Sequence, residues 1–367
     1  IDFGDLTSNA VDSPAGFAST TLAFVAGGTG NVIQSIAFSA IGGTSSDFGD
    51  LSANKDRFYG LSNTIRGITV GGNESTDIEY VTMASAGNAS DFGNLTVGRD
   101  SASCGASTTR GVSMGGFTGA AIVNTIDYIT IGSTGDASDF GDLTVSRVHG
   151  TATSSTTRGL FAGGAVSGNT SNVIDYITIG STGNASDFGN LSTTREQGLD
   201  GRGSNGTRGV FCGGSSKETP NAGSDNPQNI IEYVTIANTG NTTDFGNLSA
   251  ARKETPGTAS SNTRGLFMGG APNSGTFVNI IEYITIANTG NTTDFGDLSA
   301  VRLLTAAVVG GDRLLVTGGS TTENATNGVN IMEFITITST GNATDFGDLG
   351  TAKVEMAGTS DSHGGLA

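Results

Sequence analysis

Several residue types that usually carry chemistry are scarce in this sequence. The chain has no tryptophan, two cysteines and two histidines, His149 and His363. Two histidines are too few for a histidine-rich zinc or copper site, and they leave little material for a Ser-His-Asp triad. Cys104 and Cys212 fall in segments of different type, so we expect small buried residues rather than a disulfide. No enzyme chemistry emerges from this composition.

Charge is also scarce, and its balance is acidic. Charged residues make up 14% of the chain, well below the ~25% of an average domain. Seventeen basic residues stand against 34 acidic ones, for a net charge of −17. Such a surface repels phosphate, which argues against nucleic acid and against anionic membranes as partners. No apolar run approaches the ~20 residues that span a bilayer, so we expect no membrane insertion.

Glycine, in contrast, is abundant, with 59 of 367 residues. Only 35% of residues are hydrophobic, a composition that could indicate disorder. The strict repetition of Ile, Tyr and Phe at fixed offsets indicates instead a folded chain that packs small residues tightly. The sequence opens inside a repeat at Ile1, without an initiator Met or a visible signal peptide. We therefore expect a processed product or part of a longer polypeptide.

The tripeptide D-F-G recurs throughout the chain and defines a repeat of 44 to 57 residues. Its copies begin at Asp2, Asp47, Asp91, Asp139, Asp187, Asp244, Asp294 and Asp345. A period of roughly 50 residues with about four strand-sized pieces per unit is typical of a β-propeller. We therefore predict an all-β fold in which residues 1–367 form a single propeller domain, with a partial unit from residue 345.

Each unit reads as four short antiparallel strands. We interpret D-F-G as a turn that Asp caps and in which Gly permits a positive φ, while Phe packs between blades. A strand ending at a basic residue follows, and then a Gly/Ala/Ser/Thr-rich inner strand, as in residues 101–109 and 149–157. The next strand, T-R-G-L-F-x-G-G, ends in two glycines. The last, N-x-I-D/E-Y-I-T-I, is apolar on both faces, as expected of a strand between neighbouring sheets.

The strand counts favour seven blades, with eight as the alternative. The chain has seven Gly-Gly strands and seven Tyr-type strands but eight D-F-G segments. The tail, residues 353–367, resembles one more inner strand. Propellers usually close by mixing strands from both termini. We therefore expect the surplus to supply a strand of the closing blade in place of the atypical first unit, residues 11–21.

The order of these pieces resembles the kelch repeat, and the resemblance covers essentially the whole chain. It implies a kelch-like propeller, most simply of seven four-stranded blades. Kelch repeats usually place Trp where this chain has Phe48, Phe92, Phe140, Phe188, Phe245, Phe295 and Phe346. More narrowly, the repeat sequence I-D-Y-I-T-I-x-S-T-G-N-A-S-D-F-G-D-L resembles that of repeat proteins of marine tailed phages, especially cyanophages. That resemblance implies a virion-associated or fibre-like, extracellular protein within a larger assembly.

Two repeated slots hold thirteen of the 17 basic residues: Lys55, Arg66, Arg99, Arg110, Arg147, Arg158, Arg195, Arg208, Arg252, Arg264, Arg302, Arg313 and Lys353. The Tyr-type strand holds a repeated acidic slot: Glu79, Asp127, Asp175, Glu232, Glu282 and Glu333. We expect both basic slots to pair with these carboxylates within or between blades.

Length varies mainly in one loop of each unit, between Gly-Gly and the Tyr-type strand. From the second glycine to the acidic slot the distance ranges from 6 to 18 residues. Because the constant parts build the scaffold, we expect these loops to ring one face and bind the ligand; the alternative is solvated loops without a ligand. Residues 215–229 form the longest loop. The candidate ligand-binding residues are Lys217, Glu218, Asn221, Asp225, Asn226, Gln228, Asn273, Glu323, Asn324 and Asn327.

The leading functional hypothesis is a non-enzymatic virion or fibre module that binds a host surface glycan or protein, or another virion protein. An intracellular kelch-type adaptor is the second hypothesis. A glycan-cleaving enzyme is the third, and it needs a free acid/base carboxylate pair, whereas acidic residues here mostly belong to the repeat. D-F-G is also the magnesium motif of protein kinases, but eight copies without H-R-D or V-A-I-K exclude that reading. We expect no cofactor; Ca²⁺ on D-F-G-D pairs such as Asp139 and Asp142 is the alternative to turn capping.

Overall fold

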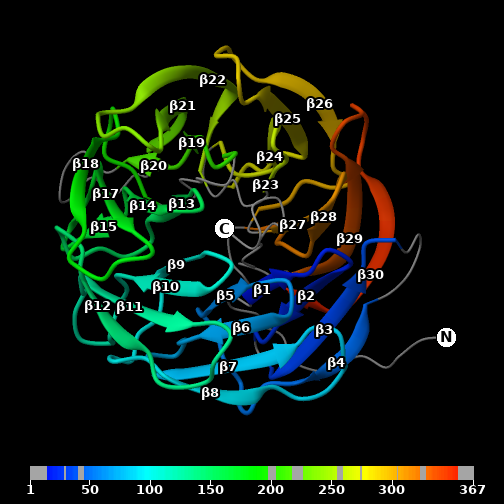
Figure 1. Ribbon diagram of the computed structural model, residues 1–367. Coiled ribbons are helices and arrows are strands. Elements are labelled where there is room, and N and C mark those ends of the chain that lie inside the picture. Colours follow the sequence, from blue (N-terminus) through cyan, green and yellow to red (C-terminus); the bar gives the residue numbers. More distant parts are fainter. Residues whose placement is uncertain are drawn as a thin grey trace.

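Four short strands recur along the chain, and successive sets form successive antiparallel sheets around a common axis (Figure 1). The computed structural model describes residues 15–28, 30–39, 45–196, 204–216, 226–253, 259–272, 275–303, 305–322 and 328–353. The fold is a seven-bladed β-propeller with mostly four-stranded blades, which confirms the all-β prediction and the choice of seven blades over eight. No helix in this described part is long and apolar enough to cross a membrane.

The first four blades follow the chain in order. Blade 1 contains β1 (Ala15–Ala18), β2 (Leu22–Ala26), β3 (Val32–Ala37) and β4 (Ser46–Asp50). Blade 2 contains β5 (Tyr59–Ser62), β6 (Arg66–Val70), β7 (Asp77–Thr82) and β8 (Ser90–Asn94). Blade 3 contains β9 (Ser103–Ala106), β10 (Arg110–Met114), β11 (Thr125–Thr130) and β12 (Ser138–Asp142). Blade 4 contains β13 (Thr151–Ser154), β14 (Arg158–Ala162), β17 (Val173–Thr178), β18 (Ser186–Asn190) and a small hairpin of β15 (Ala165–Val166) and β16 (Asn169–Thr170).

The remaining blades repeat this plan. Blade 5 contains β19 (Arg208–Cys212), β20 (Ser215–Ser216), β21 (Asn226–Thr235) and β22 (Thr243–Arg252), and its inner-strand position falls outside the described residues. Blade 6 contains β23 (Ala259–Ser260), β24 (Arg264–Met268), β25 (Ile280–Thr285) and β26 (Thr293–Asp297). Blade 7 contains β27 (Ala306–Gly310), β28 (Arg313–Thr317), β29 (Val329–Thr336) and β30 (Thr344–Lys353).

The predicted inner strands lie around the axis. Figure 1 shows β1, β5, β9, β13, β23 and β27 at the inner ends of their blades. The sequence of β9, Ser-Cys-Gly-Ala, illustrates why, since small side chains let the strands of successive blades converge. Cys104 lies there and Cys212 lies in β19; both are buried and no disulfide joins them, as the sequence predicts. Burial raises the pKa of the Cys104 thiol to about 11, so it stays protonated at neutral pH.

The hydrophobic core is divided into layers between neighbouring blades. Each layer contains one phenylalanine of the D-F-G repeat, as predicted; Phe140, for example, packs with Val112 of blade 3 and Phe161 of blade 4. The ring edge of Phe140 meets Tyr128 at a centroid distance of 5.9 Å, and five other blades repeat this aromatic pair. Burying a phenylalanine stabilises the fold by roughly 3 kcal/mol, so these layers are the main cohesion between blades.

The D-F-G tripeptide is not a turn, contrary to the sequence interpretation. It lies within the outermost strand of each blade, as in β12, and a β-bulge interrupts the pairing beside it. The Asp139 side chain accepts a hydrogen bond from the Gly141 amide at 2.9 Å, so Asp caps backbone within a strand and not in a turn. Gly141 has a φ of 139°, and the Phe140 carbonyl accepts the Gly183 amide of the next blade at 2.7 Å. Glycine is needed because two blades touch there.

Within the described residues no blade combines strands from the two termini, which corrects the expectation that the surplus at the ends completes a blade and displaces the first unit. β1 belongs to the first unit and completes blade 1, while β30 completes blade 7. The two blades then meet through the contacts used elsewhere: the Ser45 amide donates to the Asp348 carbonyl at 3.1 Å, as Ala89 does to Asp50 at 2.8 Å. The D-F-G copy at Asp2 and the tail after residue 353 lie outside the described residues.

The first basic slot pairs with the acidic slot, as predicted. Each basic residue lies at the end of the outermost strand of one blade or just after it, and contacts the carboxylate on the third strand of the next blade. Lys55–Glu79 and Arg99–Asp127 are 2.8 Å apart and Arg147–Asp175 is 2.5 Å apart; the other pairs are Arg195–Glu232, Arg252–Glu282 and Arg302–Glu333. Burial lowers the pKa of Arg302 to about 10, so the guanidinium keeps its charge at neutral pH. The side chain of Lys353 lies outside the described residues.

The second basic slot does not pair with the repeated carboxylates, and here the sequence hypothesis was wrong. Arg158 lies 4.6 Å above the Tyr176 ring. Its Nη1 donates to the carbonyls of Ile236 and Ala237 in the next blade at 3.1 and 2.9 Å. A guanidinium can stack on an aromatic ring and donate in its own plane at once, so arginine joins two blades here without a carboxylate.

Candidate binding face

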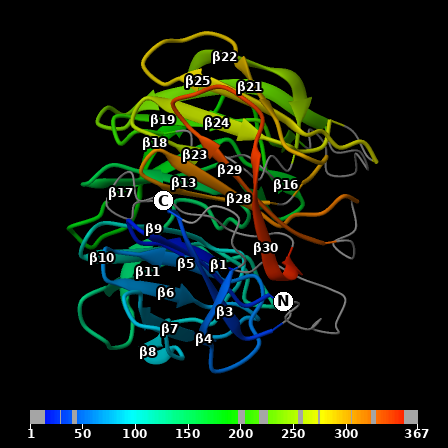
Figure 2. The same ribbon diagram turned by 90° about the vertical axis from the view of Figure 1, so that its right-hand side faces the viewer.

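The variable loops and the connectors between blades open on the same face of the propeller. Isolated β-bridges join the residue after Gly-Gly to the residue after the buried basic slot: Asp100–Phe117, Val148–Ala165, Glu196–Ser215, Lys253–Ala271 and Leu303–Ser320. This confirms the predicted arrangement. We call this side the loop face and the opposite side, which carries the uniform turns between strands one and two and between strands three and four, the turn face. Figure 2 shows the propeller from its edge, with the strands running between these faces.

The Gly-Gly pair fixes the base of each loop. Gly115 has a φ of 65°, and a Cβ built on it would lie 2.5 Å from the Arg147 carbonyl oxygen. The same oxygen accepts the Gly116 amide at 2.9 Å. On the other side of the connector, the Arg147 guanidinium donates to the Gly163 carbonyl of blade 4 at 3.0 Å. The blade 3 loop therefore starts from backbone that is held by the connector to blade 4.

The loops differ above this shared base. In blade 2 the loop is short, and Asn73 and Glu74 have φ values of 50° and 53°. In blade 4 it forms the β15–β16 hairpin, and in blade 5 β20 pairs with the extended start of β21. A common base with different tops is the arrangement that the sequence predicts for a binding face.

Two of the ten candidate ligand-binding residues can be placed. Asn226 is exposed at the start of β21. The Gln228 amide donates to Ser216 Oγ at 3.2 Å and to the Asn226 carbonyl at 2.9 Å, so Gln228 braces the loop base. The other eight lie outside the described residues: Lys217, Glu218, Asn221, Asp225, Asn273, Glu323, Asn324 and Asn327.

Backbone strain marks positions that the sequence analysis missed. Arg57, Ser101 and His149 occupy one repeat slot, ten residues after the D-F-G aspartate, with φ values of 50°, 52° and 55°. They form a chain across three blades, because the Ser101 amide donates to the Arg57 carbonyl at 3.3 Å and the His149 amide donates to the Ser101 carbonyl at 3.4 Å. A left-handed non-glycine residue costs about 1–3 kcal/mol and is concentrated at functional sites. The constant offset from D-F-G was the signal available in the sequence.

Charged groups gather beside this strained chain. Arg57, whose side chain is 47% exposed, lies 3.4 Å from the buried carboxylate of Asp100 and 3.9 Å from that of Asp56. Glu74 and Asp77 are exposed nearby in the same blade. Donors and acceptors side by side suit the hydroxyl groups of a sugar or the polar surface of a protein. Within the described residues no group of three or more His, Cys, Asp or Glu gathers to hold a metal ion.

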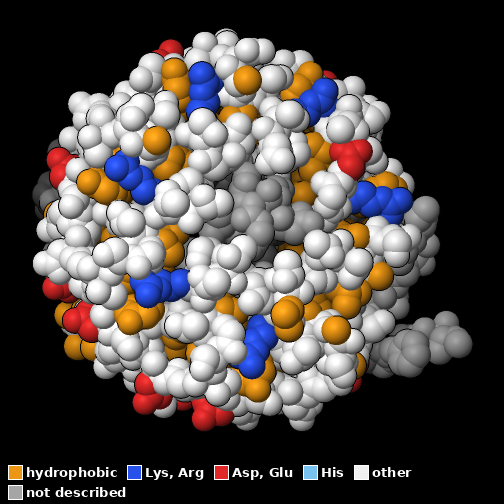
Figure 3. All heavy atoms as spheres, in the orientation of Figure 1, with side chains coloured by type: hydrophobic (Ala, Val, Ile, Leu, Met, Phe, Trp, Pro, Cys, Tyr) orange, Lys and Arg blue, Asp and Glu red, His pale blue; other side chains and the backbone are white. Residues whose placement is uncertain are grey.

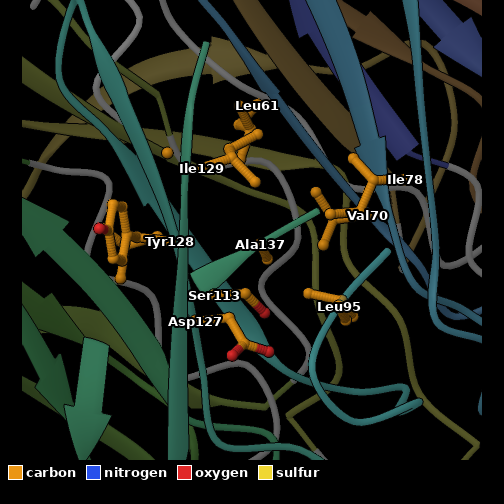
Figure 4. A pocket seen from close by; sticks show the side chains of 11 residues that line it. Leu61, Val70, Ile78, Leu95, Ser113, Asp127, Tyr128, Ile129 and Ala137 are labelled. Atoms are coloured by element: carbon orange, nitrogen blue, oxygen red, sulfur yellow. The ribbon is translucent and has the colours of Figure 1, made fainter. Parts of the chain in front are cut away.

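A small cavity lies between blades 2 and 3, but it has no room for a ligand. Its volume is about 10 Å³, which is space for one water at most. Ser113 and Asp127 line it beside Leu61, Val70 and Ile129 (Figure 4). Ser113 stands where blades 4, 5 and 6 have Phe161, Phe211 and Phe267, and the smaller side chain leaves the gap. The cavity is a local packing difference and not a binding site.

Comparisons with known proteins show the fold alone. No family model matches the chain, and no curated protein sequence matches it. Among solved structures, it is similar to YjhT, a kelch-type propeller, with a TM-score of 0.60 and 12% sequence identity. The match covers 80% of this chain and 99% of YjhT. The chain is therefore a seven-bladed propeller of the kelch-like type.

Proposed function

We propose that this chain is a non-enzymatic binding module that presents its loop face to a surface glycan or protein of a host. The observation that carries the proposal is the fixed base of the loops. In blades 1, 2, 3, 4 and 6 the second glycine of the Gly-Gly pair donates to the carbonyl of the buried basic residue that leads to the next blade, and the loops vary beyond this base. Loops of this kind change sequence and length without disturbing the scaffold, which is the usual basis of recognition by rigid folds.

The proposed setting is the surface of a virion, with the module in a tail or fibre assembly. This part of the proposal rests on the resemblance of the repeat sequence to that of marine phage proteins. Many copies on one particle turn weak polar contacts into strong attachment, because each later contact forms at high effective concentration. Docking to another virion protein through the same face is the alternative outcome.

Shortening the blade 5 loop tests the proposal. Residues 215–229 would be cut to the length of the blade 1 loop, and binding to intact marine cyanobacterial cells and to their purified surface polysaccharides would be measured. We expect binding to fall by roughly tenfold or more while the melting temperature stays within a few degrees, because surface loops tolerate length changes.

The matched control is Thr239→Ala, an exposed position in a turn of the same blade on the turn face. It should leave binding unchanged. Equal binding by the shortened and parent proteins would place the ligand elsewhere, and binding only to purified virion proteins would favour docking within the particle.

A further inference from the structure

The turn face carries a ring of arginines that the proposed function does not use. They occupy the first position of the second strand in six blades: Arg66, Arg110, Arg158, Arg208, Arg264 and Arg313. All six are partly exposed. Figure 3 shows blue side chains spaced around the centre of this face, each beside a hydrophobic side chain. Six cations therefore lie at successive blades on one side of the molecule.

Each guanidinium is held in place. The aromatic side chains of the third strands lie 4.3–4.9 Å below the arginines: Tyr80, Tyr128, Tyr176, Tyr233, Tyr283 and Phe334. Each Nη1 also donates to a carbonyl of the next blade, as Arg110 does to Ile179 at 2.7 Å. In the bonds described for Arg110, Nη2 and Nε have no protein acceptor. The donors are thus fixed before any ligand arrives, which reduces the entropy lost on binding.

This face differs in charge from the rest of the protein. The lysines and arginines of the connectors are buried against carboxylates, and within the described residues Arg57 is the one other exposed cation. The chain as a whole has a net charge of −17. Within the described residues, exposed positive charge is therefore concentrated on the turn face.

Blade 1 interrupts the ring. Leu22 stands at the arginine position and Ser35 at the aromatic position. In the other blades the arginine donates to a carbonyl at the end of the next blade's third strand, as Arg66 does to Ile131. Met83 occupies the equivalent position in blade 2. The gap shows that a blade folds without the Arg–aromatic pair, and it supplies a position where a seventh site can be built.

We propose that the turn face is a second binding surface, independent of the loop face, for a polysaccharide that carries sulfate or carboxylate groups. Guanidinium groups bind such anions through paired N–H donors. Their repetition from blade to blade matches a polymer whose anions also repeat, whereas the acidic residues of a folded protein have no such period. The polysaccharide lies along the arginines of successive blades, and its anionic groups accept hydrogen bonds from the outward N–H groups.

The test is a gain of binding, which unfolding cannot mimic. Dextran sulfate is the probe and uncharged dextran its control, in low salt and below the melting temperature of every variant. Leu22→Arg with Ser35→Tyr completes the ring and is expected to tighten dextran sulfate binding about two- to fivefold, the range of one added exposed ion pair. Ala120→Arg adds the same charge to an exposed loop-face position and should change the affinity little.

The outcomes are distinct. Binding of dextran sulfate that weakens with salt, increases in the double variant and persists after the blade 5 loop is shortened supports the proposal. No binding by the parent protein in low salt, or an equal gain from Ala120→Arg, overturns it. Tighter binding of polyglutamate than of dextran sulfate also overturns it, in favour of an acidic polypeptide.

Discussion

Replacing Arg147 by methionine is expected to lower the free energy of unfolding by about 3–5 kcal/mol, because a buried carboxylate loses its cation. Arg147 is fully buried, and its Nη2 lies 2.5 Å from Asp175. Burial lowers the pKa of Arg147, and the Asp175 carboxylate opposes that change. The Asp175 carboxylate also accepts the Thr144 amide at 3.2 Å and the Thr144 hydroxyl at 2.6 Å, so it ties the connector to blade 4. Urea denaturation followed by circular dichroism measures the loss.

A second variant separates the lost pair from a general disturbance of the core. Arg147→Met combined with Asp175→Leu removes both charges, and apolar replacement of a whole buried pair is often tolerated. We expect the double variant to be more stable than Arg147→Met alone by about 2 kcal/mol. Blade 1 shows that a neutral group serves at this place, since Gln34 Oε1 accepts the Gly350 amide at 3.1 Å. A double variant no more stable than the single one would mean that the pair itself contributes little.

Substituting Gly141 by alanine is expected to cost about 3–5 kcal/mol through strain and overlap together. Its φ of 139° suits glycine, and a Cβ there would lie 2.6 Å from backbone atoms of Gly183 in the next blade. Backbone cannot give way as a flexible side chain does, so the two blades would separate at this point. The melting temperature and the urea midpoint of the variant measure the effect.

Gly180 supplies the matched comparison. It lies in the turn that ends in Gly183, and a Cβ built on it meets no atom within 4 Å. Alanine there should change the free energy of unfolding by no more than about 0.5 kcal/mol. Similar losses at both glycines would show that the close approach of the blades does not decide the cost.

The sequence predicted the strands and the packing of Phe140 between blades, but it missed the backbone contacts that join two blades. The alternation around Tyr176 predicted a strand with two buried faces, and the small residues of 101–109 predicted an inner strand; both are confirmed. D-F-G was misread as a turn because Gly141 suggested a local bend. In the structure glycine is needed because the backbone of Gly183, 42 residues away, leaves no room for a Cβ. No local sequence pattern reveals this contact.

The two basic slots illustrate the same limit. Arg147 and Arg158 recur with similar regularity, and the excess of carboxylates suggested one role for both. The structure separates them, because Arg147 meets Asp175 inside the core and Arg158 meets a ring and two carbonyls at the surface. An arginine that stacks on an aromatic ring needs no acidic partner, so the sequence has no repeated carboxylate that would reveal this role. The positive φ at the repeat slot of Arg57 could not be predicted from residue type, because Arg57, Ser101 and His149 are different residues in the same slot.

The repeated scaffold is expected to fold whatever loops it carries, and the variable loops are expected to bind the ligand. The most direct measurement uses a protein in which every loop between the second and third strands is replaced by the short blade 2 loop, residues 73–76. Cell binding and the melting temperature would be measured on the same preparation. In salt high enough to suppress binding by the turn face, we predict a folded propeller that no longer binds host cells. A folded protein that binds cells as well as the parent would contradict this prediction.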